Sequence, residues 1–178
     1  HSQDRSLTWL TDKFTANYAW RIQRMSGDTP EQKQQRKERY QLLLKQLPLM
    51  KAAGIKIMAG SDAAALNTYV YPAESLIQEL EIFEEAGLRP LEILQTATLA
   101  GPSYFHLSDK VGTIEAGKTA DLVLLEQNPL EHITALRSIR GVISRGTYYD
   151  RKKLEGMIAQ AQEVKQQLDA SRSLTKDK

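Results

Sequence analysis

The sequence contains no cysteine and only three histidines among its 178 residues. The lack of cysteine excludes disulfide bonds, thiolate zinc sites and cysteine nucleophiles. A cysteine-free chain suits reducing and oxidising surroundings alike, so the compartment stays open between the cytoplasm and an exported, periplasmic location. No His-x-His pair occurs, and neither His106 nor His132 has a second histidine at metal-ligand spacing.

Long apolar runs and a strong charge are also missing. No run reaches the length of a membrane-spanning helix, and no signal-peptide pattern opens the sequence. Lys and Arg number 24 against 22 Asp and Glu, and the basic cluster Arg151–Lys153 is typical of a solvated surface. We therefore expect neither a membrane span nor a nucleic-acid partner. The length and the 41% hydrophobic content predict a globular chain with a sizeable core.

Helical patterns dominate the first part of the chain. Apolar residues three and four apart predict a helix over 7–25. Thr29-Pro30, with Gln32 at the third helical position, predicts the capped start of a second helix. Pro48 is expected to kink or split this helix, and Gly54 is expected to end it. Two further helices are predicted, over 73–86 and from Pro90 to an interruption at Gly101-Pro102, the latter with an apolar stripe at Leu91, Leu94 and Ala97.

A single strand is predicted between these helices, at Ile55–Ala59, before a loop over 63–72. One strand cannot satisfy its own backbone donors and acceptors. It therefore needs neighbours that this sequence does not supply, which indicates that the chain is part of a larger unit.

The pattern changes near Asp109. Short strands are predicted at 111–114, 121–125, 139–144 and 147–149, followed by an amphipathic helix from Leu154 to Leu168 and a frayed tail over 171–178. We divide the chain into residues 1–108, 109–150 and 151–178.

Asp62 is the residue with the clearest chemical potential. It follows the predicted strand 55–59 directly after Gly60-Ser61, and (β/α) barrels place catalytic groups at that end of a strand. A carboxylate there can bind a metal or exchange a proton with metal-bound water. Local sequence alone favours a simpler role, in which Asp62 caps a turn.

An ordered series of motifs resembles the amidohydrolase superfamily. Residues 53–62 resemble its last barrel strand with the closing aspartate, and Val111–Leu122 resembles the re-entry into its small β-domain. Further matches follow in order at 79–90, 91–98, 128–130 and 142–146. The resemblance covers roughly residues 50–153, and the nearest branch is the imidazolonepropionase-like and prolidase-like hydrolases.

The resemblance implies an α/β fold. Residues 1–108 would be the C-terminal segment of a (β/α)8 TIM barrel, and 109–150 part of a composite β-sandwich. It also implies one or two divalent metals, usually zinc, and hydrolysis of a C–N bond in a small-molecule or peptide-like substrate. Asp62 matches the aspartate that ligates one metal and shuttles a proton. Asp121 matches a family position in the β-domain, where a structural role is expected.

Departures from the family pattern limit what this chain can do. The family's early His-x-His, bridging lysine and two mid-barrel histidines are missing, and residues 63–67 differ from its glycine-rich loop. One carboxylate cannot hold a catalytic zinc, which needs about three protein ligands. We therefore expect the isolated chain to be inert and metal-free, and to self-associate by strand exchange. The alternatives are a non-catalytic assembly module and a complementation subunit.

Overall fold

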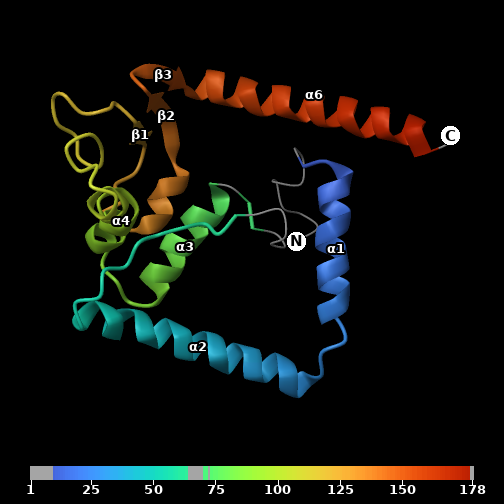
Figure 1. Cartoon of the computed structure of the whole chain (residues 1–178), viewed down its shortest axis with the longest axis horizontal. Coiled ribbons are helices and arrows are strands. Elements are labelled where there is room, and N and C mark those ends of the chain that lie inside the picture. Colours follow the sequence, from blue (N-terminus) through green and yellow to red (C-terminus); the bar gives the residue numbers. More distant parts are fainter. Residues whose placement is uncertain (1–9, 64–69, 72, 177–178) are drawn as a thin grey trace.

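The computed structural model describes residues 10–63, 70–71 and 73–176. Helices α1 (Asp12–Met25), α2 (Pro30–Ala52) and α6 (Arg151–Lys176) follow three sides of the outline in Figure 1. The shorter elements gather on the fourth side, around α3 (Glu74–Glu85). The chain is therefore a mixed α/β structure, and the expected class is confirmed in this coarse sense.

Helix α2 begins at its predicted cap. The Thr29 hydroxyl accepts a hydrogen bond from the Gln32 amide at 3.3 Å, and the Gln32 side chain accepts one from the Thr29 amide at 2.9 Å. This reciprocal pair confirms the capping box. Helix α1 starts after Thr11, and the start predicted at residue 7 lies outside the described residues.

Helix α2 runs through Pro48 without a break, so the predicted split at this residue is wrong. A proline removes one backbone donor from the helix. Leu44 is buried and Leu47 packs against the core, so side-chain packing just before Pro48 holds the helix in place. The helix ends before Gly54, which has a left-handed φ of 77°.

The strand predicted at 55–59 is also wrong, because the segment is neither helical nor paired with a strand among the described residues. The described strands pair only with one another, and their sheet lies elsewhere in the fold. The segment leaves α2 and crosses beside α3 (Figure 1), where Ile57 and Ala59 pack against the core.

Helix α4 (Pro90–Thr98) confirms the helix predicted from Pro90, but its buried face matches the predicted stripe only in part, since of that stripe Leu94 packs against the core. Ile93 and Thr96 are buried, whereas Leu91 of the predicted apolar stripe is 55% exposed. The interruption falls at Leu99, before α5 (Ala100–Tyr104). Gly101-Pro102 lies in the first turn of α5, where a proline removes no helix hydrogen bond.

The sheet has three antiparallel strands in the order β1-β2-β3. They are β1 (Leu122–Leu125), β2 (Ile139–Ser144) and β3 (Thr147–Asp150). The strand predicted at 111–114 is wrong. Its Gly112 has a φ of 106°, and an added Cβ would lie 2.8 Å from the Thr98 carbonyl oxygen, so the backbone there bends tightly against the end of α4.

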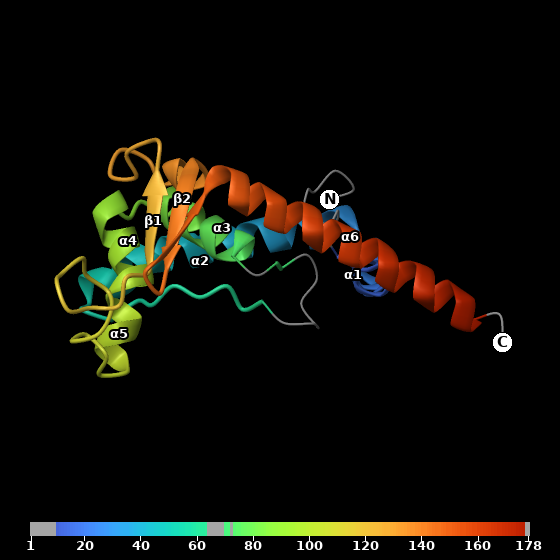
Figure 2. The same cartoon turned by 90° about the horizontal axis from the view of Figure 1, so that it is seen from above.

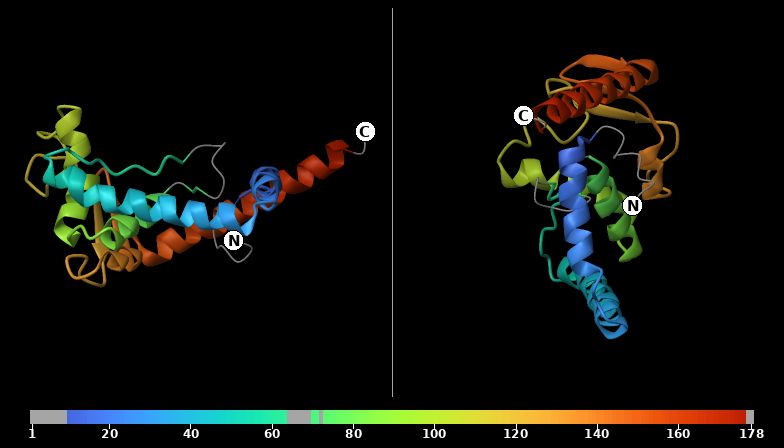
Figure 3. Two further views of the ribbon diagram at one scale, coloured as in Figure 1. Left: turned by 90° about the horizontal axis from the view of Figure 1, so that it is seen from below. Right: turned by 90° about the vertical axis from the view of Figure 1, so that its right-hand side faces the viewer.

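Two further features differ from the predicted pattern. A 3-10 helix, η2 (Ile133–Arg137), occupies the connection from β1 to β2. Helix α6 continues as far as Lys176, past the predicted end at Leu168, whereas the fraying predicted over 171–178 stays a prediction. Figure 2 shows α6 leaving the sheet and extending well beyond it. Lys165, just past the middle of α6, bonds Asp169 at 2.8 Å and Asp12 of α1 at 3.2 Å, and so ties the projecting half of α6 to α1. Figure 3 shows α1 next to this half of α6.

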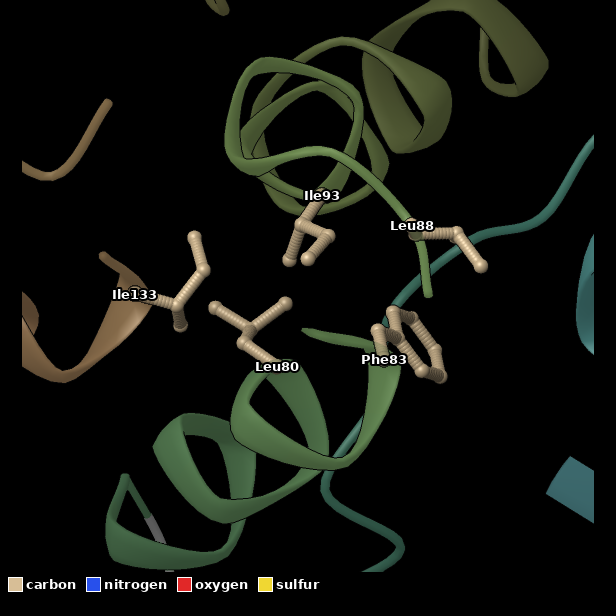
Figure 4. Packing of buried hydrophobic residues seen from close by; sticks show 5 residues of the cluster. All are labelled: Leu80, Phe83, Leu88, Ile93 and Ile133. Atoms are coloured by element: carbon tan, nitrogen blue, oxygen red, sulfur yellow. The ribbon is translucent and has the colours of Figure 1, made fainter. Parts of the chain in front are cut away.

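One hydrophobic cluster joins α3, α4 and η2. Figure 4 shows Leu80 of α3 between Ile93 and Ile133, with Phe83 and Leu88 beside them. Ile93 and Ile133 are fully buried, and each such side chain stabilises the fold by about 1.5–3 kcal/mol. The cluster therefore holds η2, which precedes β2, against the helices that surround the end of segment 55–60.

An arginine fork reinforces the same junction. The Arg137 guanidinium binds both carboxylate oxygens of Glu81, at 2.6 and 3.0 Å, and reaches Glu74 at 2.9 Å. These hydrogen bonds, that to Glu81 foremost, raise the pKa of Arg137. Bidentate geometry makes this pair more specific than an ordinary surface ion pair.

In the described part of the chain, no helix is both long and apolar enough to cross a membrane.

We expect Ile133→Ala to lower the free energy of unfolding by about 2–5 kcal/mol, because it removes fully buried atoms and leaves a cavity. Urea unfolding followed by circular dichroism measures the change. Ile114 is 84% exposed and supplies the matched control, since Ile114→Ala should change stability by less than about 0.5 kcal/mol. Equal losses in the two variants would contradict the packing described for η2.

Candidate functional site

Asp62 lies in a tight turn at the end of segment 55–60. Its residue is exposed, and its φ of 44° is in the left-handed region, which aspartate tolerates better than most residues. The Ala63 amide donates to the Ser61 hydroxyl at 3.3 Å, so this side chain closes the turn locally. The carboxylate therefore sits on a defined backbone turn.

Two backbone amides anchor the segment immediately before this turn. The Ala59 amide donates to the Thr96 carbonyl oxygen of α4 at 3.1 Å. The Gly60 amide donates to a carboxylate oxygen of Glu79 on α3 at 2.9 Å. The two amides are thus satisfied by two different helices instead of by neighbouring strands.

Glu79 is partly buried, and this burial raises its pKa above that of an ordinary glutamate, although the hydrogen bond from Gly60 acts in the opposite direction. Sequence reasoning missed this residue. The available signal was its position three residues after Leu76 and four before Phe83, on the core-facing side of a helix. A carboxylate on that side needs a partner, and the Gly60 amide is one.

Asp121 has a structural contact, as expected for its place in the β-domain. Its carboxylate accepts a hydrogen bond from the Arg145 amide at 2.6 Å, in the turn between β2 and β3. The Gly146 amide of the same turn donates to the Ala120 carbonyl oxygen at 3.0 Å. Asp121 therefore ties the hairpin to the start of β1.

A shallow hollow lies at the beginning of α2, apart from the Asp62 turn. Five residues line it: Asp28, Gln32, Gln35, Arg36 and Arg39. Arg36 forms an ion pair with Asp28, so part of the positive charge is already balanced. The hollow shares no residue with the turn and adds no group to it.

The profile of the amidohydrolase family matches residues 39–161. This chain belongs to the amidohydrolase family. The matched span includes Asp62, both helices that anchor its turn, and the three-stranded sheet. Amidohydrolases are in general metal-dependent hydrolases that act on C–N bonds.

Individual relatives support the membership. The 5-methylthioadenosine/S-adenosylhomocysteine deaminase of Desulforudis audaxviator is 34% identical over 84 residues, which are 44% of this chain and 20% of that protein. The imidazolonepropionase of Thermoplasma volcanium is 27% identical over 105 residues, or 57% of this chain and 25% of the relative. This amidohydrolase chain thus spans a fifth to a quarter of these curated relatives.

A solved structure from Bifidobacterium longum, provisionally identified as a prolidase, has a similar fold. It superposes with a TM-score of 0.58 at 27% identity, covering 78% of this chain and 35% of that one. The similarity to imidazolonepropionase-like and prolidase-like proteins confirms the expected branch of the family.

The described part of this amidohydrolase does not by itself fit a metal centre. It contains no group of three His, Cys, Asp or Glu side chains that could hold an ion. His106 is exposed in the turn after α5, and His132 is exposed on the surface, with its Nδ1 4.0 Å from Glu84. Neither histidine is gathered with Asp62 into such a group. Asp62 would need ligands from outside the described residues.

We expect Glu79 to titrate at a higher pH than the ordinary value of 4.5, because burial disfavours its charged form. The midpoint is measured by ¹³C NMR of the side-chain carboxyl group. The folded pKa exceeds the unfolded one, so the contribution of Glu79 to stability is fully present below the unfolded pKa. It is lost as the pH rises through the folded pKa. A midpoint at or below 4.5 would contradict the observed burial.

We also expect the purified 178-residue chain to carry much less than one equivalent of zinc, with no change on Asp62→Ala, because one exposed carboxylate is too weak a site. Plasma emission spectroscopy measures the metal content. Near-stoichiometric zinc that disappears in Asp62→Ala would show instead that copies of the chain assemble a complete ligand set.

Proposed function

We propose that this chain is the C-terminal part of a metal-dependent amidohydrolase that hydrolyses an amide or peptide-like C–N bond, and that it supplies Asp62 to the active site. The observation that carries the proposal is the position of Asp62 within the family match. It follows a segment whose backbone is anchored to both α3 and α4. The coverage of relatives, 20% to 35% of their lengths, supports a part of a longer protein.

In this proposal, residues 55–59 become the last strand of a (β/α)8 barrel once neighbouring strands are present. Residues 1–108 belong to the barrel, 109–150 to a composite β-sandwich, and 151–178 form a C-terminal helix. The unpaired state of segment 55–59 supports this arrangement. So does the exposure of Ile55 and Met58, which are 50% and 49% exposed.

Large apolar side chains outside the segment give further support. Five of them, on α2 and at the end of α5, are exposed: Leu42 59%, Leu43 52%, Leu49 68%, Tyr104 71% and Phe105 61%. Apolar surface of this extent generally marks a face that another part of a protein covers. The rest of the barrel would cover it in the whole enzyme. Self-association of the isolated chain through the same surface stays a prediction.

The proposed substrates are peptide-like or cyclic amides. The similarity to an imidazolonepropionase and to a provisionally identified prolidase supports this class of substrate. The same two groups of hydrolases are the branch that the sequence resembles. Asp62 would accept a proton from the attacking water and return it to the leaving nitrogen, because a carboxylate within reach of both atoms can serve each half of the reaction. The remaining ligands and substrate contacts would come from outside the described residues.

Besides a complementation subunit, whose metal ligands would come from a separate chain, a non-catalytic assembly module is the second candidate. The lack of a three-residue metal cluster in the described part favours it, and so does the long, projecting helix α6. The two candidates differ in whether Asp62 affects a chemical step.

We expect Asp62→Asn to lower kcat about 10²- to 10⁴-fold, the usual loss when a general acid–base group is removed. The variant is made in the complete gene product that contains these 178 residues, and Xaa-Pro dipeptides, N-acyl amino acids and cyclic amides are the assayed substrates. Asp109→Asn is the matched control, since Asp109 is exposed and lies outside the turn.

An active gene product with equal kcat in wild type and Asp62→Asn would contradict the role given to Asp62. Absence of hydrolysis from the metal-loaded wild-type gene product, for all three substrate classes, would favour the assembly module.

A further inference from the structure

The Asp62 turn has a support from α3 that the family match alone does not reveal. The Gly60 amide lies two residues before Asp62 and donates to Glu79 at 2.9 Å, across 19 residues of sequence. The other anchor of the segment is the Thr96 carbonyl oxygen, which belongs to the backbone of α4. Among the described residues, Glu79 is therefore the side chain that bonds the segment's backbone just before the turn.

We propose that Glu79 is a positioning residue that fixes the Gly60–Asp62 turn and so places the Asp62 carboxylate for catalysis. The inference rests on the proposed function, because it assigns Glu79 a role in the same site. Glu79 itself contacts Gly60, and its effect on the reaction would pass through the backbone of residues 60–62.

The shape of the turn explains why such support matters. Asp62 adopts a left-handed φ of 44°, a conformation that most side chains disfavour and that surrounding contacts must maintain. The local bond within the turn joins Ala63 to Ser61, and it does not connect the turn to the core. Glu79 makes that connection, because α3 carries the buried residues Leu80 and Phe83.

The location of Glu79 in α3 suits a rigid support. Its neighbour Leu80 lies at the centre of the hydrophobic cluster (Figure 4), and Glu81 is held by Arg137 at 2.6 Å. A side chain on such a helix turn has little freedom to follow a moving loop. The bond from Gly60 thus ties the turn to the most tightly packed part of the chain.

The test compares Glu79→Ala, Glu79→Gln and the control Gln78→Ala in the complete gene product. Gln78 is the adjacent, exposed residue and bonds only Glu74 of its own helix, at 3.1 Å. Hydrogen–deuterium exchange resolved to the Gly60 amide reports the anchor without any need for a substrate. Steady-state kinetics on the dipeptide, N-acyl and cyclic amide substrates report the placement of Asp62.

We expect Glu79→Ala to accelerate exchange at Gly60 about tenfold, as loss of one hydrogen bond to a charged group predicts. It should lower kcat about 10²-fold with little change in KM, because small displacements of a catalytic group act mainly on the chemical step. Glu79→Gln keeps an acceptor oxygen and should restore most of both effects. Gln78→Ala should change neither.

Two results would overturn the inference. Unchanged exchange at Gly60 in Glu79→Ala would show that the anchor does not exist in the whole protein. Faster exchange with an unaltered kcat would show that the anchor does not place Asp62. If wild type hydrolyses none of the substrates, the proposed function fails and the catalytic role of Glu79 fails with it, while the exchange data still decide whether Glu79 holds the turn.

Discussion

Backbone hydrogen bonding of segment 55–60 is the constraint on which the arrangement of this chain depends. Backbone amides of folded proteins are paired with protein groups or with water, and no described strand lies beside the segment to accept from its amides. The Ala59 and Gly60 amides instead donate to α4 and α3. These two bonds bring the segment to the helices that surround the hydrophobic cluster. They also determine where the Asp62 turn begins.

The hydrophobic cluster fixes the two helices that carry the acceptors of these bonds. It consists of Leu80, Phe83, Leu88, Ile93 and Ile133. A hydrogen bond positions a loop only if the acceptor is itself fixed, and α3 and α4 are fixed by fully buried contacts to each other and to η2. The fork from Arg137 to Glu74 and Glu81 adds a polar link across the same junction. The three-stranded sheet is joined to the helices through η2. The position of the sheet relative to α3 and α4 therefore depends on the same contacts.

Local signals predicted the elements whose stability is local. The capping box at Thr29, the helices of residues 74–85 and 90–98, and the strands at 122–125, 139–144 and 147–150 all follow from periodicity and turn residues. The strands predicted at 55–59 and 111–114 did not form. The first lacks neighbours, and the second bends where Gly112 meets the end of α4. Strand pairing and the close approach of two backbone segments both depend on residues far away in the sequence. A short stretch of about five residues therefore cannot predict either of them.

In the candidate site too, local sequence pointed to one residue and missed another whose role depends on a distant contact. Asp62 was singled out because it follows a predicted strand and matches the closing aspartate of the family motif, and its catalytic role stays a prediction. Glu79 was not identified, since its role depends on a contact 19 residues away. Its position on the apolar side of α3 was the visible hint, but that position is equally compatible with a carboxylate that merely borders the core. Only the location of the Gly60 amide distinguishes the two.

Positioning and chemistry are thus separable in this amidohydrolase chain. The Ala59 and Gly60 bonds that anchor the segment before Asp62 lie between residues 59 and 96, inside the family match. The described residues hold no three-ligand metal cluster, so the groups that would give Asp62 a reaction to assist must come from elsewhere. A carboxylate can be held in place by its own helices without being able to catalyse, because placement needs two hydrogen bonds and a packed core, whereas activation of water needs a complete ligand set. The chain meets the first of these conditions, and under the proposed function the second would be met by residues outside the described part.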